Sequence, residues 1–276
     1  MLIAEILKAI FLGIIEGITE WLPVSSTGHM LLFDRFLSLD MSAEFKEMFF
    51  YVIQLAAIIA VIILFWDKMF PFQFSDRSKP VIKKDTFIVW VKVVIACIPG
   101  AIVTLLFDDI IDAHLHTAAV IAAALIIYGI AFIVIEKKNK DKKPSTEKLE
   151  DISFKQALEI GLFQTLSIIP GTSRSGSTIM GGLVMGISRV AVSEFTFFLA
   201  VPVMIGMSAI KLIKFGFSFT PEEIFVLAAG SATAFMVSVV VIKVFMGYIR
   251  KHDFTAFGWY RIILGAAVLA LELLVF

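Results

Sequence analysis

The sequence predicts an all-α polytopic membrane protein, with six full transmembrane helices plus two re-entrant helical hairpins arranged as an inverted-topology repeat. Three observations lead to this prediction: the composition, the lengths of the apolar runs, and a likeness between the two halves. The 276 residues are 59% hydrophobic, include 27 phenylalanines and have a mean hydropathy of +0.94. A soluble domain of ordinary composition is far less apolar. The chain therefore belongs in a bilayer.

Charge and cysteine content exclude several other classes. The formal net charge is zero, so no overall charge points to nucleic acid, and we expect no nucleic-acid partner. The single cysteine, Cys97, lies inside an apolar run and excludes a disulfide framework or a thiolate metal cluster.

Six apolar runs are long enough to cross a hydrocarbon core of about 30 Å, which needs roughly 20 helical residues. We place these spans near 47–66, 87–107, 118–136, 191–213, 224–245 and 259–276.

Two further apolar stretches, 9–24 and 157–170, are too short to cross comfortably. Each runs into a proline and a segment rich in small polar residues: LPVSSTGH (22–29) and IPGTSRSGST (169–178). Broken helices at membrane depth are tolerated only inside protein or along a wet cavity, because lipid cannot satisfy the freed backbone groups. These two stretches are therefore predicted to be re-entrant hairpins.

The charges of the connections orient the spans. Segments 67–86 and 137–151 are rich in lysine and arginine, which predicts that they face the cytoplasm, whereas the connection around Asp108 has neither residue and is predicted to be external. Both termini are then external, and the hairpins within 1–33 and 155–187 enter from opposite sides. Lys92, Lys243 and Arg261 lie near cytoplasmic span ends, where we expect them to snorkel toward the headgroups.

The two halves resemble each other. Each contains one hairpin and three spans, an odd number of crossings, so the second half would be inverted relative to the first. The predicted organisation is a first repeat at 1–138, a charged cytoplasmic linker at 139–154 and a second repeat at 155–276. Residues 9–29 align with 157–177; the matches are Ala9 with Ala157, Gly13 with Gly161 and, after a one-residue shift, Pro23 with Pro170 and Ser26 with Ser173.

The first motif, EGITEWLPVSSTGH, carries two carboxylates four residues apart, Glu16 and Glu20, on one helix face. A charge at membrane depth costs about 2.5–3.5 kcal/mol. The pair is therefore expected to hold a metal ion, to exchange a proton, or to pair with Arg174. The hydroxyl run at 25–27 could serve only as a helix N-cap, and His29 alone could be a hydrogen-bonded interior side chain. Their convergence on one break instead favours a nucleophile with an adjacent base.

The second motif, PGTSRSGST, has the chemistry of a phosphate site. Arg174 is a planar, permanently charged donor suited to phosphate oxygens, and the flanking glycines allow close backbone approach. A helix starting near Thr178 would add free N–H groups that favour an anion. A flexible polar loop is the alternative. Gln54 and Glu194 could support the site from neighbouring spans, or could serve as packing contacts between helices.

Together the two motifs closely resemble the undecaprenyl-diphosphate phosphatase family, also called the bacitracin-resistance proteins, over essentially the whole chain. The resemblance implies an enzyme of the bacterial cytoplasmic membrane that hydrolyses undecaprenyl diphosphate to undecaprenyl phosphate and inorganic phosphate. Its active site would open to the outer face, it would use a divalent cation, Mg²⁺ or Ca²⁺, and it would bind a long-chain polyprenyl diphosphate lipid. A homodimer is a candidate assembly.

Carried over by motif position, the predicted site has three parts. The catalytic set is Glu20, Ser26, His29 and Arg174, and the metal-binding pair is Glu16 and Glu20. The predicted substrate-binding residues are Ser25, Thr27, Gly171, Ser173, Ser175, Thr178 and Gln54.

One mechanistic hypothesis has Ser26 attacking the terminal phosphorus, with His29 as base or as proton donor to the leaving group. Water or His29 itself remains open as the nucleophile. The alternative function is a lipid-phosphate flippase, alone or in addition to the phosphatase, because inverted repeats with discontinuous helices are the usual architecture of secondary transporters.

Overall fold

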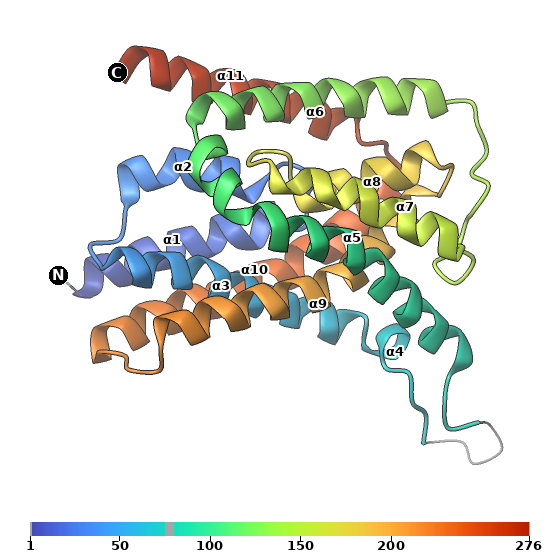
Figure 1. Ribbon diagram of the computed structural model, residues 1–276, viewed down its shortest axis with the longest axis horizontal. Helices are drawn as coiled ribbons and strands as arrows, with labels where there is room; N and C mark the ends of the chain where they lie inside the picture. The colour runs from blue at the N-terminus through green and yellow to red at the C-terminus, as the bar shows by residue number, and fades with distance from the viewer. Residues whose placement is uncertain (1, 75–79, 276) are drawn as a thin grey trace.

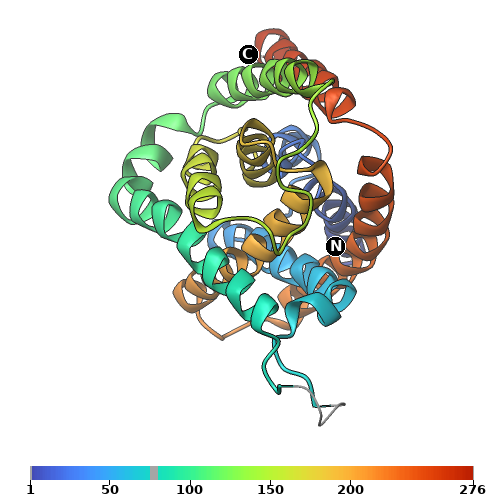
Figure 2. The same cartoon turned by 90° about the vertical axis from the view of Figure 1, so that its right-hand side faces the viewer.

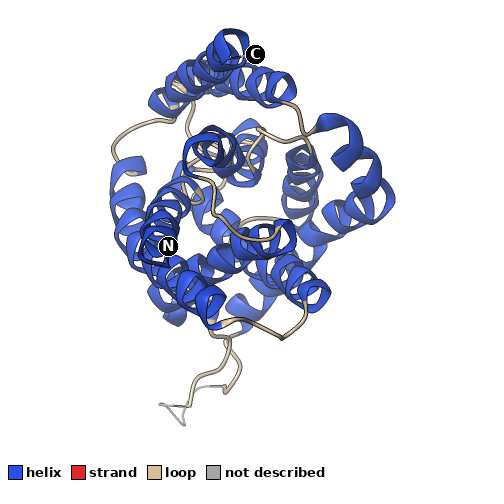
Figure 3. Cartoon of the chain, turned by 90° about the vertical axis from the view of Figure 1, so that its left-hand side faces the viewer, coloured by secondary structure: helices blue, strands red, loops and turns tan. Residues whose placement is uncertain are grey.

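The computed structural model describes residues 2–74 and 80–275, so Arg77 and Lys79 of the first basic segment lie outside the described residues. The described residues form helices and connections, with isolated β-bridges but no strand (Figure 3). The helices are α1 (Leu2–Thr19), α2 (Ser26–Leu37), α3 (Ala43–Leu64), α4 (Trp66–Met69), α5 (Lys84–Leu115), α6 (Ala118–Asn139), α7 (Phe154–Thr165), the 3-10 turn η1 (Leu166–Ile168), α8 (Arg174–Val184), α9 (Arg189–Phe215), α10 (Pro221–Ile249) and α11 (Thr255–Val275).

Six of these helices are long and apolar enough to cross a membrane: α3, α5, α6, α9, α10 and α11. They coincide with the six predicted spans, and the chain is a multi-pass membrane protein. Some of these helices begin or end at other residues than predicted. Helix α3 begins at Ala43 because the side chain of Ser42 accepts a hydrogen bond from the Phe45 N–H at 3.1 Å. Helix α5 continues through the acidic segment around Asp108, which was predicted to be a connection, and ends at Leu115.

The two predicted hairpins are pairs of shorter helices, α1 with α2 and α7 with α8. Helices α2, α7 and α8 have only 12, 12 and 11 residues, too few to cross a bilayer as single helices. The helical pattern breaks at 20–25 in the first pair and at 169–173 in the second. Seen end-on, α7 and α8 lie inside a ring of longer helices (Figure 2). Pro170, Gly171 and Thr172 of the second break are buried, so protein, not lipid, surrounds this break.

The connections divide between the two ends of the bundle. Both termini and the α9–α10 turn lie at one end of Figure 1, whereas the connections from α4 to α5 and from α6 to α7 lie at the other. The two lysine-rich segments thus share a side. Lys243 is exposed as expected, but Lys92 is buried, and its ammonium donates to the carbonyl of Glu150 at 2.7 Å. The snorkelling prediction for Lys92 was wrong because the linker supplies an acceptor within reach.

The packing of the helices crosses between the two halves of the chain. Helix α1 packs along α10, α7 packs along α5, and α6 packs along α11. The α6–α11 contact is close: a Cβ added at Gly129 would lie 2.6 Å from the Gly258 carbonyl oxygen, and one at Gly265 would lie 2.8 Å from the Ala122 oxygen. Glycine at these two positions lets the backbones touch. This seam fixes α11, which carries two residues of the site described next.

Candidate active site

The two breaks have the same backbone geometry. Ser25 and Ser173 are the non-glycine residues with positive φ among those described, at 71° and 73°. Each is the N-cap of the following helix: Ser25 Oγ accepts from the Gly28 N–H at 3.3 Å, and Ser173 Oγ accepts from the Gly176 N–H at 3.2 Å. The alignment of Ser26 with Ser173 was therefore wrong by one residue, since Ser25 is the structural counterpart. The N-cap alternative holds for Ser25, and it leaves Ser26 free for another role.

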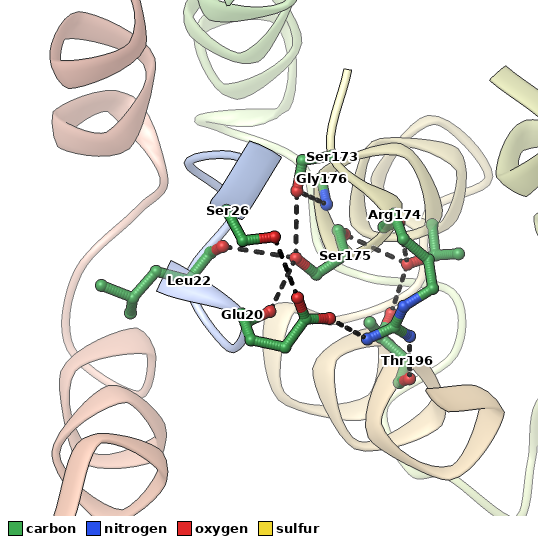
Figure 4. Close-up of polar contacts among 9 residues, drawn as sticks. Glu20, Leu22, Ser26, Ser173, Arg174, Ser175, Gly176 and Thr196 are labelled. Atoms are coloured by element: carbon green, nitrogen blue, oxygen red, sulfur yellow. Dashed lines mark hydrogen bonds and ion pairs between the residues drawn. The ribbon is translucent and has the colours of Figure 1, made fainter. Parts of the chain in front are cut away.

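Glu20 lies at the centre of the site (Figure 4). Its Oε2 accepts a hydrogen bond from Ser26 Oγ at 3.1 Å, and its Oε1 pairs with Arg174 Nη2 at 2.9 Å. The Glu20 N–H still bonds the Glu16 carbonyl at 3.0 Å, so the helical spacing that puts both carboxylates on one face persists to the break. A hydroxyl, a carboxylate and a guanidinium from both halves of the chain are thus joined.

The N-terminal residues of α8 form hydrogen bonds to the first break and to α9. Ser175 Oγ lies 3.3 Å from the carbonyl oxygens of both Glu20 and Leu22. Arg174 Nη1 donates to the Thr196 carbonyl at 3.3 Å, and the Thr178 and Thr196 hydroxyls lie 2.8 Å apart. Helices α2 and α8 therefore both begin at this site. Their free N–H groups and positive dipole ends favour an anion there.

His29 is buried, with 4% of its surface exposed, and points toward α11. Its Nδ1 lies 2.8 Å from the Ser25 carbonyl oxygen, and its Nε2 lies 2.6 Å from the Tyr260 hydroxyl, with the two rings stacked. A carbonyl can only accept, so Nδ1 carries a proton, and in the neutral ring Nε2 accepts from Tyr260. The structure thus pairs Ser26 with Glu20 and His29 with Tyr260.

Arg261 holds the two breaks together. It is 0% exposed, and it donates to the carbonyl of Pro23 at 3.2 Å and to those of Gly171 and Thr172 at 2.9 Å each. The expectation that Arg261 snorkels was wrong, because both broken helices present unpaired carbonyl groups to it. Gly171, whose carbonyl accepts one of these bonds, has a φ of 91°, a left-handed conformation that favours glycine.

The carboxylate of Glu16 is 1% exposed, and its Oε1 has no hydrogen-bond partner. An orphaned buried carboxylate oxygen one turn from Glu20 is suited to a proton or a hard cation. The described part of the chain has no group of three or more His, Cys, Asp or Glu side chains arranged to hold a metal ion by themselves. Two carboxylates with phosphate oxygens from a ligand match the way Mg²⁺ is usually bound, so the residues fit the predicted cation.

A cavity of about 540 Å³ adjoins the site. Thr27 and Arg174 line its polar part, and apolar residues of α5 and α9, among them Val103 and Val203, line the rest. Gln54, predicted to bind substrate, is half-buried on α3 and is not part of this lining. The cavity can accept a ligand with an anionic head and an apolar remainder.

Sequence reasoning missed two residues of this arrangement, Thr196 and Tyr260, and assigned a wrong role to Arg261. Thr196 lies inside the apolar span predicted at 191–213, and its hydroxyl was not singled out. Tyr260 and Arg261 are neighbours at the start of the last span, and their partners in the first motif, His29 and Pro23, lie 231 and 238 positions away in the chain. No local pattern marks such a contact.

The fold and the site define a class: a polytopic helical membrane protein whose broken helices enclose a buried group of a hydroxyl, a carboxylate and a guanidinium. Residues 9–267 match the family model described as bacitracin resistance protein BacA, and the chain belongs to this family. It is 65% identical over 265 residues to an undecaprenyl-diphosphatase of Enterococcus faecalis, covering 96% of each chain. Proteins of the same name from Desulfitobacterium hafniense and Lachnoclostridium phytofermentans are 56% and 57% identical, over 98% and 96% of this chain and 96% of each relative.

Proposed function

We propose that the protein hydrolyses undecaprenyl diphosphate to undecaprenyl phosphate and inorganic phosphate, which recycles the carrier lipid for cell-wall synthesis and gives bacitracin resistance. The names of its relatives and of its family support this proposal. The observation that carries it is the group formed by Ser26, Glu20 and Arg174, with Ser26 Oγ 3.1 Å from one Glu20 oxygen and Arg174 2.9 Å from the other. This group provides a nucleophile, a base and a phosphate-binding cation.

In the proposed reaction the Ser26 oxygen attacks the terminal phosphorus and its proton passes to Glu20 Oε2. The bond from that phosphorus to the bridging oxygen breaks, and undecaprenyl phosphate leaves. Water then hydrolyses the phosphoserine and releases inorganic phosphate. Arg174 and the N-termini of α2 and α8 stabilise the charge on the phosphoryl oxygens, which is the main contribution a protein makes to phosphoryl transfer.

Two other groups have supporting roles in this proposal. Because Ser26 is paired with Glu20, His29 is the candidate proton donor to the leaving phosphate. It would serve this role as the imidazolium, since in the neutral ring Nε2 accepts from the Tyr260 hydroxyl and has no proton to give. Glu16 and Glu20 would hold Mg²⁺ or Ca²⁺, which neutralises phosphate charge when bound.

The proposal includes an inverted-topology repeat with boundaries at 1–138, 139–154 and 155–276, and two re-entrant hairpins. The matched N-caps Ser25 and Ser173 support it, as does the reciprocal packing of α1 on α10 and α7 on α5. With the lysine-rich segments in the cytoplasm, α1 and α2 enter from outside, and the active site opens to the outer face of the bacterial cytoplasmic membrane.

Phosphate release from purified protein in detergent tests the phosphatase directly. The substrate is a long-chain prenyl diphosphate, assayed with and without chelator. We expect wild type to release phosphate and Arg174→Ala and Glu20→Ala to lose at least about a hundredfold in rate. His252→Ala, a change in the exposed α10–α11 connection, is the matched control. Equal rates in all four proteins would refute the proposed site.

Lipid transport is the alternative from another class, favoured by the reciprocal packing of the two halves, since secondary carriers are commonly built this way. Reconstituted vesicles with prenyl phosphate in one leaflet test it. Movement of the lipid to the other leaflet by the Ser26→Ala variant would assign transport independently of hydrolysis.

A homodimer would be detected by mass determination of the protein in detergent.

A further inference from the structure

A second buried polar side chain lines the cavity that Arg174 also lines, and it has no role in the reaction described above. Gln164, near the C-terminal end of α7, is 5% exposed, and its Oε1 has no hydrogen-bond partner. It lines the same cavity as Thr27 and Arg174. Buried amide groups are almost always hydrogen-bonded, so an unpaired one at a cavity wall indicates a ligand that completes it.

The surrounding helices leave room for this amide. Helix α7 packs along α5, and at the point of contact α5 has Gly100. A Cβ added at Gly100 would lie 3.1 Å from Gln164 Nε2, so a larger residue would press on the amide. The amide of Gln164 therefore lies next to the backbone of Gly100 and also lines the cavity. Rotation of the amide by 180° exchanges its donor and acceptor, so either can face a ligand.

Gln164 occupies the position in α7 that Glu16 occupies in α1. Each lies nine residues before the serine that caps the next helix, Ser173 or Ser25, and each has a buried Oε1 without a partner. The chemistry of the two positions differs. The carboxylate suits a cation or proton, whereas the neutral amide offers N–H donors without adding negative charge near Arg174. An anionic ligand would be repelled by a carboxylate at the second position and bound by an amide.

We propose that Gln164 is a substrate-binding residue that donates its side-chain amide N–H to a phosphate oxygen of the prenyl phosphate head group, beside Arg174. This deepens the proposed function and rests on it for the identity of the substrate. The shared ligand chemistry is a phosphate ester of a long apolar chain. Both the diphosphate substrate and the monophosphate product contain it.

Three substitutions separate the possible roles of Gln164. Gln164→Leu removes the amide at similar volume, Gln164→Glu keeps the shape but places a carboxylate on the phosphate, and Gln164→Asn shortens the reach. A hydrogen bond to a charged group is expected to be worth about a factor of ten or more in binding. We therefore expect KM for the prenyl diphosphate to rise about tenfold in Gln164→Leu and further in Gln164→Glu, with kcat changed much less. Gln73→Leu, in the connection between α4 and α5, is the matched control and should leave both constants unchanged.

Equilibrium binding of a long-chain prenyl monophosphate to the same proteins is the second measurement, because this lipid has no anhydride bond to cleave. It separates failure of this inference from failure of the proposed function. If wild type releases no phosphate, the phosphatase fails, but a tenfold weaker affinity of Gln164→Leu for the monophosphate still supports the contact. If Gln164→Leu is not monodisperse in detergent and so does not fold properly, the test of the proposal is made with Gln164→Glu. Wild-type affinity and KM in Gln164→Glu would overturn the proposal, because a carboxylate in contact with phosphate cannot be neutral in its effect.

Discussion

Arg174 Nη2 lies 2.9 Å from Glu20 Oε1, and this ion pair joins two residues that are 154 positions apart in the chain. Both side chains are largely shielded from solvent, with exposed fractions of 12% and 8%. Breaking such a pair leaves an uncompensated charge, which is costly. A bound phosphate would take up part of the hydrogen-bonding capacity of Arg174. The pair therefore joins the two halves of the chain at the site, and in the proposed reaction the remaining N–H groups of Arg174 bind the phosphate.

Replacing Arg174 by lysine is expected to reduce kcat/KM by about a hundredfold or more, because a single ammonium cannot contact Glu20, Thr196 and phosphate in the planar geometry of the guanidinium. Phosphate release by the purified variant measures this. Thermal unfolding of the same protein in detergent serves as the control for folding. A lysine variant with wild-type kcat/KM would contradict the role of the guanidinium.

Tyr260→Phe removes the hydroxyl that lies 2.6 Å from His29 Nε2 but keeps the stacked ring. If His29 transfers a proton to the leaving group, the variant should lose activity by about tenfold, within the usual range for losing part of general acid catalysis. The pH profile of kcat should shift as well.

Ser26→Ala should lose far more activity than Tyr260→Phe. Full activity in His29→Ala would exclude His29 from proton transfer and leave that role to Glu20 or water.

Glu16→Gln keeps the size of the side chain and removes a negative charge from the predicted cation site. We expect the concentration of Mg²⁺ or Ca²⁺ needed for half-maximal phosphate release to rise by at least about tenfold, because metal affinity depends on the charge of the ligands. Titration of each ion into chelator-treated protein provides the measurement. Glu5→Gln, which alters a carboxylate paired with Lys8 near the N-terminus of α1, is the control. Identical titration curves for Glu16→Gln and wild type would argue against a cation at this position.

Arg261→Met should destabilise the protein and distort both breaks. The change leaves the carbonyl groups of Pro23, Gly171 and Thr172 without their donor, and each buried group left unpaired costs about 1–3 kcal/mol. We expect a clear drop in the unfolding temperature in detergent, together with loss of phosphate release. Lys243→Met, an exposed cation on α10, should change neither. A stable but inactive Arg261→Met protein would instead mean that the arginine acts on the bound anion.

Much of the fold was predictable because a bilayer restricts the choices. Six apolar runs gave six spans, and the proline and serine segments marked both breaks. The spacing of Glu16 and Glu20 correctly placed the two carboxylates on one helix face, and the suggested pairing of a carboxylate with Arg174 holds for Glu20.

What could not be predicted depends on contacts distant in the sequence. A snorkelling arginine and a buried arginine have the same local sequence, and only the carbonyl groups of both breaks distinguish them for Arg261. The partner of His29 could not be inferred either, since Tyr260 lies on the last helix. The repeat alignment failed by one residue because identical residue types, Ser26 and Ser173, were matched in place of equivalent backbone positions.

The packing of α1 along α10 and of α7 along α5 bears on how the chain is made. During synthesis α1, which carries Glu16, is made before α10, the helix that packs along it. Glu20 cannot meet Arg174 until the second half is inserted. The two carboxylates of the first half are therefore made before their final neighbours exist, and the group of Ser26, Glu20 and Arg174 can form only after α8 has been synthesised.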